Sequence, residues 1–461
     1  MKRTINLSFL IIAACFSGLA QTTVKRDPTI KQMTEEVSEK NIETIVRKLV
    51  NFKTRHTLSD TTSKTEGIGA ARNWIKSEME KYALASGGRM TVQFDEFIQP
   101  AGGRIDKPTK LKNILATLKG TDPTDNRIYI VSGHYDSRVN NILEANSVEP
   151  GAVDDASGTA VSMEIARVMS KHAFPATIIF MAVAGEEQGL NGSTNVAKRA
   201  KNENWNVDAM LNNDIVGNTL GMENNLKDNV HVRVFSEGVP STDMAVHSDS
   251  AAIRRANLGV ASLVNNGGEN DSPSRQLARY IKETAERYVD FLDVKLIYRR
   301  DRFLRGGDHV PFLQQGFSAV RFTEMNEDFT RQHQTVRREN GIDYGDMPDF
   351  ADYQYIQKVG RMNLSVLANL ASAPAQPQNV VVLTAELTNK TSLKWDAPKG
   401  KQPVGYYVLM RETTSPFWEK KFYVTDTKAL IEYSKDNYFF AVQSVDADGH
   451  ESLAVFPKPG R

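Results

Sequence analysis

Hydrophobic and polar residues alternate with two different periods along this chain. Between residues 29 and 82, apolar side chains such as Ile45 and Leu49 recur every three or four positions, which is typical of helices that pack against a core. Farther along, the apolar runs 127–133 and 176–184 alternate with stretches of helical periodicity. Strands that alternate with helices form parallel sheets covered on both faces. The pattern therefore predicts an α/β fold with a doubly wound, mostly parallel sheet.

The same alternation continues to about residue 372. We expect a strand, a long amphipathic helix, a second strand and a closing helix at 207–216, 274–292, 318–323 and 353–370, respectively. A linker is predicted after them, because Pro374 and Pro377 cannot continue a helix. These limits place the α/β domain at residues 28–372.

The C-terminal part changes to short strand-like runs, which predict a small all-β sandwich at residues 378–461. It resembles a fibronectin type III domain through Leu393-Lys394-Trp395, Gly405-Tyr406-Tyr407-Val408 and the run from Asn437 to Val442. The resemblance implies that Trp395 is the core tryptophan and Tyr438 the tyrosine corner. A β appendage of another kind is the alternative. A module joined by a linker usually has its own core, so we expect the α/β domain to fold without it.

The first 20 residues have the pattern of a secretory signal peptide. Lys2 and Arg3 precede an apolar run at 7–16, and small residues lead to Ala20. We therefore expect an exported protein, secreted, periplasmic or on the cell surface. The alternatives are a buried first helix and a lipoprotein that carries lipid on Cys15. The run is too short for a membrane span, and no other segment is apolar over the ~18 residues that a span requires.

Charge and cysteine content exclude further classes of function. The chain has 57 basic and 56 acidic side chains, with no long run of one sign, so we expect no nucleic acid as partner. Its single cysteine, Cys15, lies inside the predicted leader. The mature chain would then have neither a disulfide nor a thiol for redox chemistry.

Residues whose side chains could bind a metal or take part in catalysis follow the predicted strands. His134 ends the run 127–133, and Asp136 comes two residues later. The carboxyl edge of an open α/β sheet is where ligands bind, although a lone histidine there would more often be structural. A histidine that binds a metal needs an acceptor for its second ring nitrogen, and Asp136 is close enough in sequence to supply one.

Paired acidic residues occur at two further places. Asp154 and Asp155 precede a helix, where they could simply cap it. Glu186 and Glu187 follow the run 176–184, and adjacent residues of an extended segment point in opposite directions. One glutamate could thus bind a metal while the other faces a bound water.

Two later segments complete the set. Asp214 ends a predicted strand, and His309 lies in the loop Gly306-Gly307-Asp308-His309-Val310-Pro311-Phe312 before the last strand. Two histidines and three carboxylates at successive strand ends make a mixed nitrogen and oxygen set that suits zinc.

Residues 41–370 resemble zinc peptidases of family M28, the co-catalytic aminopeptidases. The motifs that carry the resemblance are Gly133-His134-Tyr135-Asp136-Ser137, the segment 151–158, Gly185-Glu186-Glu187-Gln188-Gly189, Asn213-Asp214 and Asp308-His309-Val310-Pro311-Phe312. Together they cover most of the chain and are highly specific.

The resemblance implies two zinc ions per chain and a particular role for each site residue. Asp154 would bridge the ions, His134 and Asp214 would complete one site, and Glu187 and His309 the other. Glu186 would be the general base, with Asp136 and Asp155 behind the ligands. The peptide bond between Asp154 and Asp155 would be cis. Peptide substrates would lose their first residue by metal-assisted hydrolysis.

The chain departs from the family pattern near the substrate side. Arg331-Gln332-His333-Gln334-Thr335 stands where relatives often show a histidine followed by an aspartate and a threonine. His333 would then be a substrate-side donor or a surface histidine. Arg302 and Arg305 would meet a carboxylate or carbonyl of the substrate, or would be solvated charges.

Other functions remain open on the same scaffold. These are a carboxypeptidase, a dipeptidase, a glutaminyl cyclase with one zinc, and a non-catalytic binding ectodomain whose sandwich supplies adhesion. The five intact ligands disfavour the cyclase, and the retention of Glu186 disfavours the binding ectodomain. The sequence does not identify a partner for the C-terminal domain.

Overall fold

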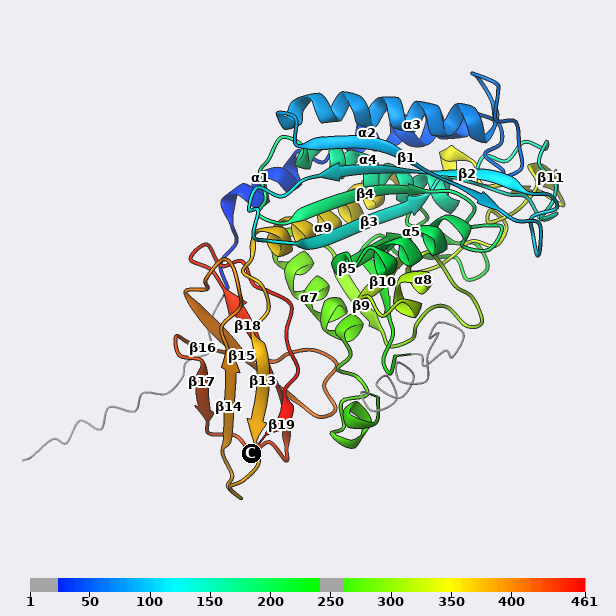
Figure 1. Cartoon of the computed structure of the whole chain (residues 1–461). Coiled ribbons are helices and arrows are strands. Elements are labelled where there is room, and N and C mark those ends of the chain that lie inside the picture. Colours follow the sequence, from blue (N-terminus) through cyan, green and yellow to red (C-terminus); the bar gives the residue numbers. More distant parts are fainter. Residues whose placement is uncertain (1–23, 241–259, 461) are drawn as a thin grey trace, which may run out of the picture.

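The computed structural model describes residues 24–240 and 260–460. The predicted leader, with Cys15, lies outside the described residues. Figure 1 shows a large twisted sheet covered by helices, with small β-sheets of the C-terminal part beside one end of it. This arrangement confirms the predicted α/β fold followed by a small all-β region.

The described residues form one eight-stranded sheet in the order β1-β2-β4-β3-β5-β10-β8-β9. The neighbours β4, β3, β5 and β10 run parallel, whereas β8 is antiparallel to β10 and β1 forms an antiparallel pair with β2. The bounds are β1 Met90–Gln99, β2 Thr109–Leu118, β3 Arg127–His134, β4 Thr177–Val183, β5 Asn206–Asn213, β8 His231–Ser236, β9 Asp293–Ile297 and β10 Ala319–Glu324.

The central strands read as unbroken apolar runs because both faces of the sheet are buried. In β4, Ile178 and Phe180 join the core on one face, while Ile179 and Met181 join the core on the other. Apolar residues of α1 Pro28–Glu35, α2 Glu39–Val50, α3 Gly67–Ala83, α4 Ser157–Met169, α7 Pro273–Tyr288 and α9 Tyr353–Ser372 enter the first core. Those of α5 Asn191–Asn202 and α8 His309–Gln314 enter the second.

The sequence pattern missed the outer strands and misplaced some ends. Strand β1 is exposed at many positions, as expected at a sheet edge, so no continuous apolar run marks it. The region 29–82 contains three helices with a loop at 51–66, not one helical stretch. Strand β5 ends at Asn213 because the backbone turns at Ile215, whose φ is 64°.

Several short elements surround the large sheet. Two small hairpins join β6 Leu220–Gly221 to β7 Leu226–Lys227 and β11 Arg337–Glu339 to β12 Ile342–Tyr344. Short helical turns occupy Leu84–Ser86, Ala152–Ala156 and Pro348–Phe350. Among the described helices, none is both long and apolar enough to cross a membrane.

The C-terminal region packs two sheets face to face around an apolar core. Their orders are β17-β14-β13-β19 and β16-β15-β18. Trp395 is 1% exposed and contacts the Tyr406 ring edge-on, so it is a core residue as predicted. Tyr438 begins a strand and packs edge-on against Tyr433. The bounds are β13 Gln378–Leu383, β14 Thr391–Asp396, β15 Gly405–Glu412, β16 Lys420–Val424, β17 Lys428–Ile431, β18 Tyr438–Val445 and β19 Lys458–Gly460.

The sandwich is docked on the α/β domain through buried charges. Asp271, before α7, binds Arg279 of that helix and Arg411 of β15 at 2.9 and 2.7 Å, and its side chain is 0% exposed. Arg287 of α7 forms a two-point contact with Glu451. The linker is packed as well, since Arg127 donates to the backbone carbonyl of Ala373. Removal of the sandwich would leave Asp271 without Arg411 and Arg287 without Glu451, so we expect it to lower the stability of the α/β domain.

We predict that Asp271→Ala lowers the free energy of unfolding by about 3–5 kcal/mol, because it leaves two buried guanidinium groups without their carboxylate. Denaturant unfolding of the purified variant measures the change. Asp290→Ala is the matched control, since Asp290 is exposed and pairs with Arg26 at 3.4 Å. Its expected cost is below about 1 kcal/mol. Equal losses in the two variants would contradict the interface.

A second buried contact ties the segment before α1 to the sandwich. His450 lies 2.8 Å from both Asp446 and Asp27, with Lys401 also on Asp446 and Asp448 nearby. Burial disfavours the charged ring, but the two carboxylates outweigh it and raise the pKa of His450. A raised pKa means that the contact stabilises the fold fully below the unfolded histidine pKa of about 6.5 and loses this contribution as pH rises through the folded value.

We accordingly predict that His450→Gln lowers the melting temperature more at about pH 5.5 than at about pH 9. The protonated fraction of the ring falls as pH rises through the raised pKa of His450. Melting curves of wild type and variant at both pH values measure the difference. A loss that is the same at both would mean that the imidazole charge does not contribute.

Candidate metal centre

Neighbouring parallel strands deliver the chemically capable residues to one edge of the sheet. His134 is the last residue of β3, Asp214 follows β5, and Glu186 and Glu187 follow β4. Asp154 lies in the turn before α4. Because β4, β3 and β5 are adjacent and parallel, their carboxyl ends meet, as they do at ligand sites of open α/β sheets.

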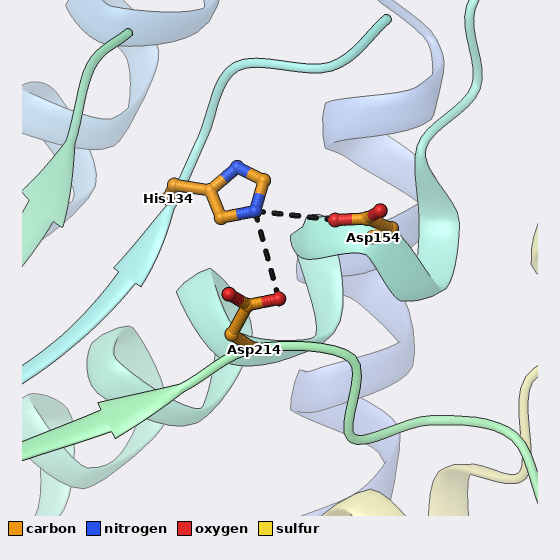
Figure 2. A group of neighbouring side chains, drawn as sticks. All are labelled: His134, Asp154 and Asp214. Carbon is orange, nitrogen blue, oxygen red and sulfur yellow. Dashed lines mark ion pairs between the residues drawn. The ribbon is translucent and has the colours of Figure 1, made fainter. Parts of the chain in front are cut away.

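A first group consists of His134, Asp154 and Asp214. The Nε2 of His134 is 3.2 Å from Asp154 Oδ1 and 3.9 Å from Asp214 Oδ1, and Figure 2 shows the ring edge directed at both carboxylates. The other ring nitrogen, Nδ1, is 3.1 Å from the backbone carbonyl of Asp136, which can only accept. Nε2 is therefore the ring nitrogen that faces two acids, and a cation bound between these three atoms would satisfy all of them.

A second group shares Asp154 with the first. The Nε2 of His333 lies 2.8 Å from Asp154 Oδ2 and 2.9 Å from Glu187 Oε1. In each group the candidate ligand atoms all lie within 4.8 Å of one another. The two oxygens of Asp154 thus face different histidines, which is the position of a carboxylate that serves two ions.

His309 does not lie where the family resemblance placed it. Its Nε2 is 2.8 Å from the backbone carbonyl of Arg300, and it belongs to neither group. Burial lowers its pKa to about 4, so the ring is neutral and fixed by that hydrogen bond. His333 takes the place beside Asp154 and Glu187 that we expected for His309, and it is not the surface histidine or separate substrate donor considered from the sequence.

The signal for His333 was present but weak. It lies in an irregular loop after β10, with a φ of 55°, so no strand end marks it as a candidate. The histidine of Arg331-Gln332-His333-Gln334-Thr335 stands in the family motif, but the residues after it differ. His309 was chosen because the motif Asp308-His309-Val310-Pro311-Phe312 matched the family pattern.

Asp155 binds three backbone segments at the centre of the site. Its Oδ2 accepts from the His134 N–H at 3.0 Å, and its Oδ1 accepts from Gly158 and Ile215 at 2.9 and 3.3 Å. The peptide bond between Asp154 and Asp155 is cis, as the resemblance implied. Asp155 thereby fixes the positions of His134, Asp154 and the residue after Asp214 relative to one another.

The carboxylate of Asp136 does not orient the His134 ring as expected from the sequence. Its backbone carbonyl, not its carboxylate, is the close partner of His134, since the carboxylate is 3.7 Å from the ring nitrogen. The carboxylate instead accepts from the backbone N–H groups of Glu186 and Glu187 at 3.3 and 3.1 Å. It therefore positions the two glutamates.

Three residues that the sequence did not single out hold the acidic groups in place. Arg321, 0% exposed, binds Asp214 at 2.8 Å, and Arg138 binds Glu187 at 2.7 Å. Asp346 accepts from the backbone N–H of Asp154 at 2.7 Å. Each acts from a distant part of the chain, so only the folded structure reveals it.

Neighbouring positive charges stabilise the ionised forms of two acids at the site. Burial opposes ionisation of Glu187, but His333 and Arg138 outweigh it and lower the pKa of this carboxyl to about 2. The pKa of Asp154 is likewise held well below its usual value by the two histidines, against the effect of burial. Burial raises the pKa of Glu186, which lines a cavity of about 400 Å³ together with Asp154, Asp214, Glu187 and His333.

Comparison with known proteins identifies the family. A probable zinc metalloprotease of Leptosphaeria maculans is 46% identical over 96% of this chain and 100% of its own length. One of Pyricularia oryzae is 45% identical over 94% of this chain and 85% of its own. The model of peptidase family M28 matches residues 113–226, which contain His134, Asp154, Glu186, Glu187 and Asp214. The chain belongs to peptidase family M28.

Solved structures agree with this M28 peptidase in fold. The LapA aminopeptidase of Legionella pneumophila has a TM-score of 0.52 at 18% identity and covers 76% of each chain. LapB of the same organism gives the same values. At such identity the likeness concerns the fold.

The donor set of this M28 zinc metalloprotease fits its metal. Carboxylate oxygens and imidazole nitrogens are ligands that zinc accepts. His134 directs Nε2 at two carboxylates, an arrangement that suits a bound cation. The residues that would hold zinc are His134, Asp154, Asp214, Glu187 and His333.

We predict that His333→Ala reduces zinc affinity more than about tenfold, because it removes a direct ligand. His309→Ala should retain zinc, since that ring faces Arg300. Competition with a chromophoric chelator measures affinity, and circular dichroism checks that both variants are folded. Loss of zinc in the folded His309 variant, with retention in the His333 variant, would restore the original assignment.

Proposed function

We propose that this M28 peptidase is an exported aminopeptidase with two zinc ions, which hydrolyses the first peptide bond of peptides. The observation that supports it most is Asp154, whose Oδ1 faces His134 and whose Oδ2 faces His333. Asp214 would complete the first site and Glu187 the second. The sharing of one carboxylate favours two ions over the single zinc of a cyclase.

Zinc ions bound by these residues would lower the pKa of a water molecule and polarise the scissile carbonyl. Glu186 is the residue of this chain that would accept the water's proton and pass it to the leaving amine. It lines the same cavity as Asp154 and Glu187, and the carboxylate of Asp136 holds its backbone. Asp155 keeps the ligands fixed while the proton moves.

The restriction to the first residue is supported by fold neighbours that are aminopeptidases, such as LapA. A carboxypeptidase or dipeptidase on this scaffold is the second candidate, because basic side chains line the cavity. Amino-acid 4-nitroanilides and their N-blocked equivalents separate the two. Hydrolysis of the free-amine compounds alone would support an aminopeptidase, and hydrolysis of only N-blocked peptides would overturn it.

Export remains part of the proposal, based on the predicted leader at residues 1–20. Cleavage after Ala20 would leave Gln21 as the first residue of the mature chain. Lipidation at Cys15 is the alternative. Mass spectrometry of the protein from the natural host would distinguish a mature chain that begins at Gln21 from one that begins with a lipidated Cys15.

We predict that Glu186→Gln lowers kcat at least about 100-fold, because an amide cannot accept the proton. Zinc content and melting temperature should remain near wild type, since Glu186 is not among the proposed ligands. Glu203→Gln, at an exposed position after α5, is the matched control and should keep its activity. A Glu186 variant with near wild-type kcat would remove this residue from the mechanism.

A further inference from the structure

We propose that the active-site cavity binds a carboxylate of the substrate through Arg104 and Arg305. The inference rests on the proposed peptidase function and specifies its substrate class. Four arginines line the cavity, namely Arg104, Arg138, Arg302 and Arg305. The acids that line it are Glu186 and three candidate zinc ligands, Asp154, Glu187 and Asp214.

Two of the four arginines are committed to acids of the protein. Arg138 binds Glu187 at 2.7 Å, with its side chain 14% exposed. Arg302 lies between Asp301 and Glu327, at 3.2 and 2.8 Å. Neither is free to meet a substrate without breaking an internal pair.

The side chain of Arg104 is held at the cavity by one hydrogen bond to a backbone carbonyl. It lies in the exposed loop between β1 and β2, and its Nη1 donates to the backbone carbonyl of Glu187 at 2.8 Å. Within residues 24–240 and 260–460, no carboxylate forms an ion pair with it. A guanidinium has five N–H donors, so the anchor places Arg104 beside the segment of Glu186 and leaves other donors for a ligand.

Arg305 belongs to a group that carries an excess of positive charge. Its Nη1 is 3.2 Å from Glu327, and the same carboxylate also binds Arg302 and Arg233, each at 2.8 Å. Burial opposes ionisation of Glu327, but the nearby guanidinium groups outweigh it and lower the pKa of this carboxyl to about 2. In order of effect they are Arg302, Arg321, Arg233 and Arg305.

The excess of positive charge around Arg305 remains when the ion pairs connected to Glu327 are counted. Arg321 links this group to Asp301 and Asp214. Counted through arginine–carboxylate pairs as far as Asp214, where it meets the metal centre, the network contains four arginines and three carboxylates. They are Arg233, Arg302, Arg305 and Arg321, and Glu327, Asp301 and Asp214. Four positive charges minus three negative charges leave one positive charge. Of the two network arginines that line the cavity, Arg305 is 34% exposed and Arg302 10%.

A planar guanidinium matches a carboxylate through two parallel hydrogen bonds. The cavity should therefore favour peptides that bring a carboxylate close to the scissile bond. That group could be the C-terminal carboxylate of a short peptide or the side chain of an acidic residue after the cleaved bond. Both sources present the same chemistry to Arg104 and Arg305.

Two pairs of peptides distinguish the sources. Leucyl-glycyl-glycine and its C-terminal amide differ only in the terminal charge. The C-terminal amides of leucyl-glycyl-glutamate and leucyl-glycyl-glutamine differ only in the side-chain charge. We expect zinc-loaded wild type to release leucine from the charged member of at least one pair with a kcat/KM about five- to tenfold higher, and the double variant Arg104→Gln, Arg305→Gln to lose this preference.

Lys107→Gln and Arg299→Gln are matched controls, since they remove exposed cations near the same two loops that do not line the cavity. Both should keep the wild-type preference. Equal rates on the members of both pairs, or a preference that survives in the double variant, would overturn the carboxylate site.

Calorimetric titration of Glu186→Gln with the same four peptides separates this inference from the proposed function. Tighter binding of the charged peptides would support the carboxylate site even if wild type released no leucine from any of them, a result that would refute the aminopeptidase. Equal binding of charged and neutral peptides would reject the site while leucine release by wild type upheld the function.

Discussion

The buried carboxylate of Asp155 is the constraint on which the site depends. It accepts backbone N–H groups from His134 at the end of β3, from Ile215 after β5 and from Gly158 at the start of α4. Unpaired buried N–H groups are costly, so the three segments are stabilised only in this arrangement. The same contacts bring His134, Asp154 and Asp214 together before any metal contributes. Backbone hydrogen bonds to Asp155 thus position the residues of the metal centre.

Around that centre, charges are arranged in two layers with different tasks. The inner layer consists of ion pairs between an arginine and a candidate zinc ligand, Arg321 with Asp214 and Arg138 with Glu187. These contacts orient the acids and favour their ionised forms. The outer layer, at the cavity, includes Arg104 and Arg305, whose positive charges are not fully matched by acids of the protein. The first layer suits cation binding, and the second suits an anionic group of the substrate.

The C-terminal sandwich contributes to stability at the strand ends opposite the metal centre. Its segment 453–458 lines a cavity with Val207 and Ser318, at the amino ends of β5 and β10, whereas the metal centre lies at the carboxyl ends. Buried ion pairs such as Arg287 with Glu451 fix the sandwich to α7. Such pairs specify geometry, because their desolvation is compensated only when the partners meet. The sandwich can therefore stabilise the domain while leaving access to the cavity unchanged.

The sequence by itself determined the sheet centre and most of the site. Parallel strands buried on both faces appear as apolar runs, and the residues that follow β3, β4 and β5 are marked by those runs, so His134, Glu187 and Asp214 could be found from the pattern. The edge strand β1 was missed because many of its positions are exposed, so it has no such run. Only the tertiary structure decided between His309 and His333 and revealed Arg321 and Asp346. These residues reach the centre from irregular loops and distant elements, and a distance between side chains far apart in sequence is set by packing, which no local pattern encodes.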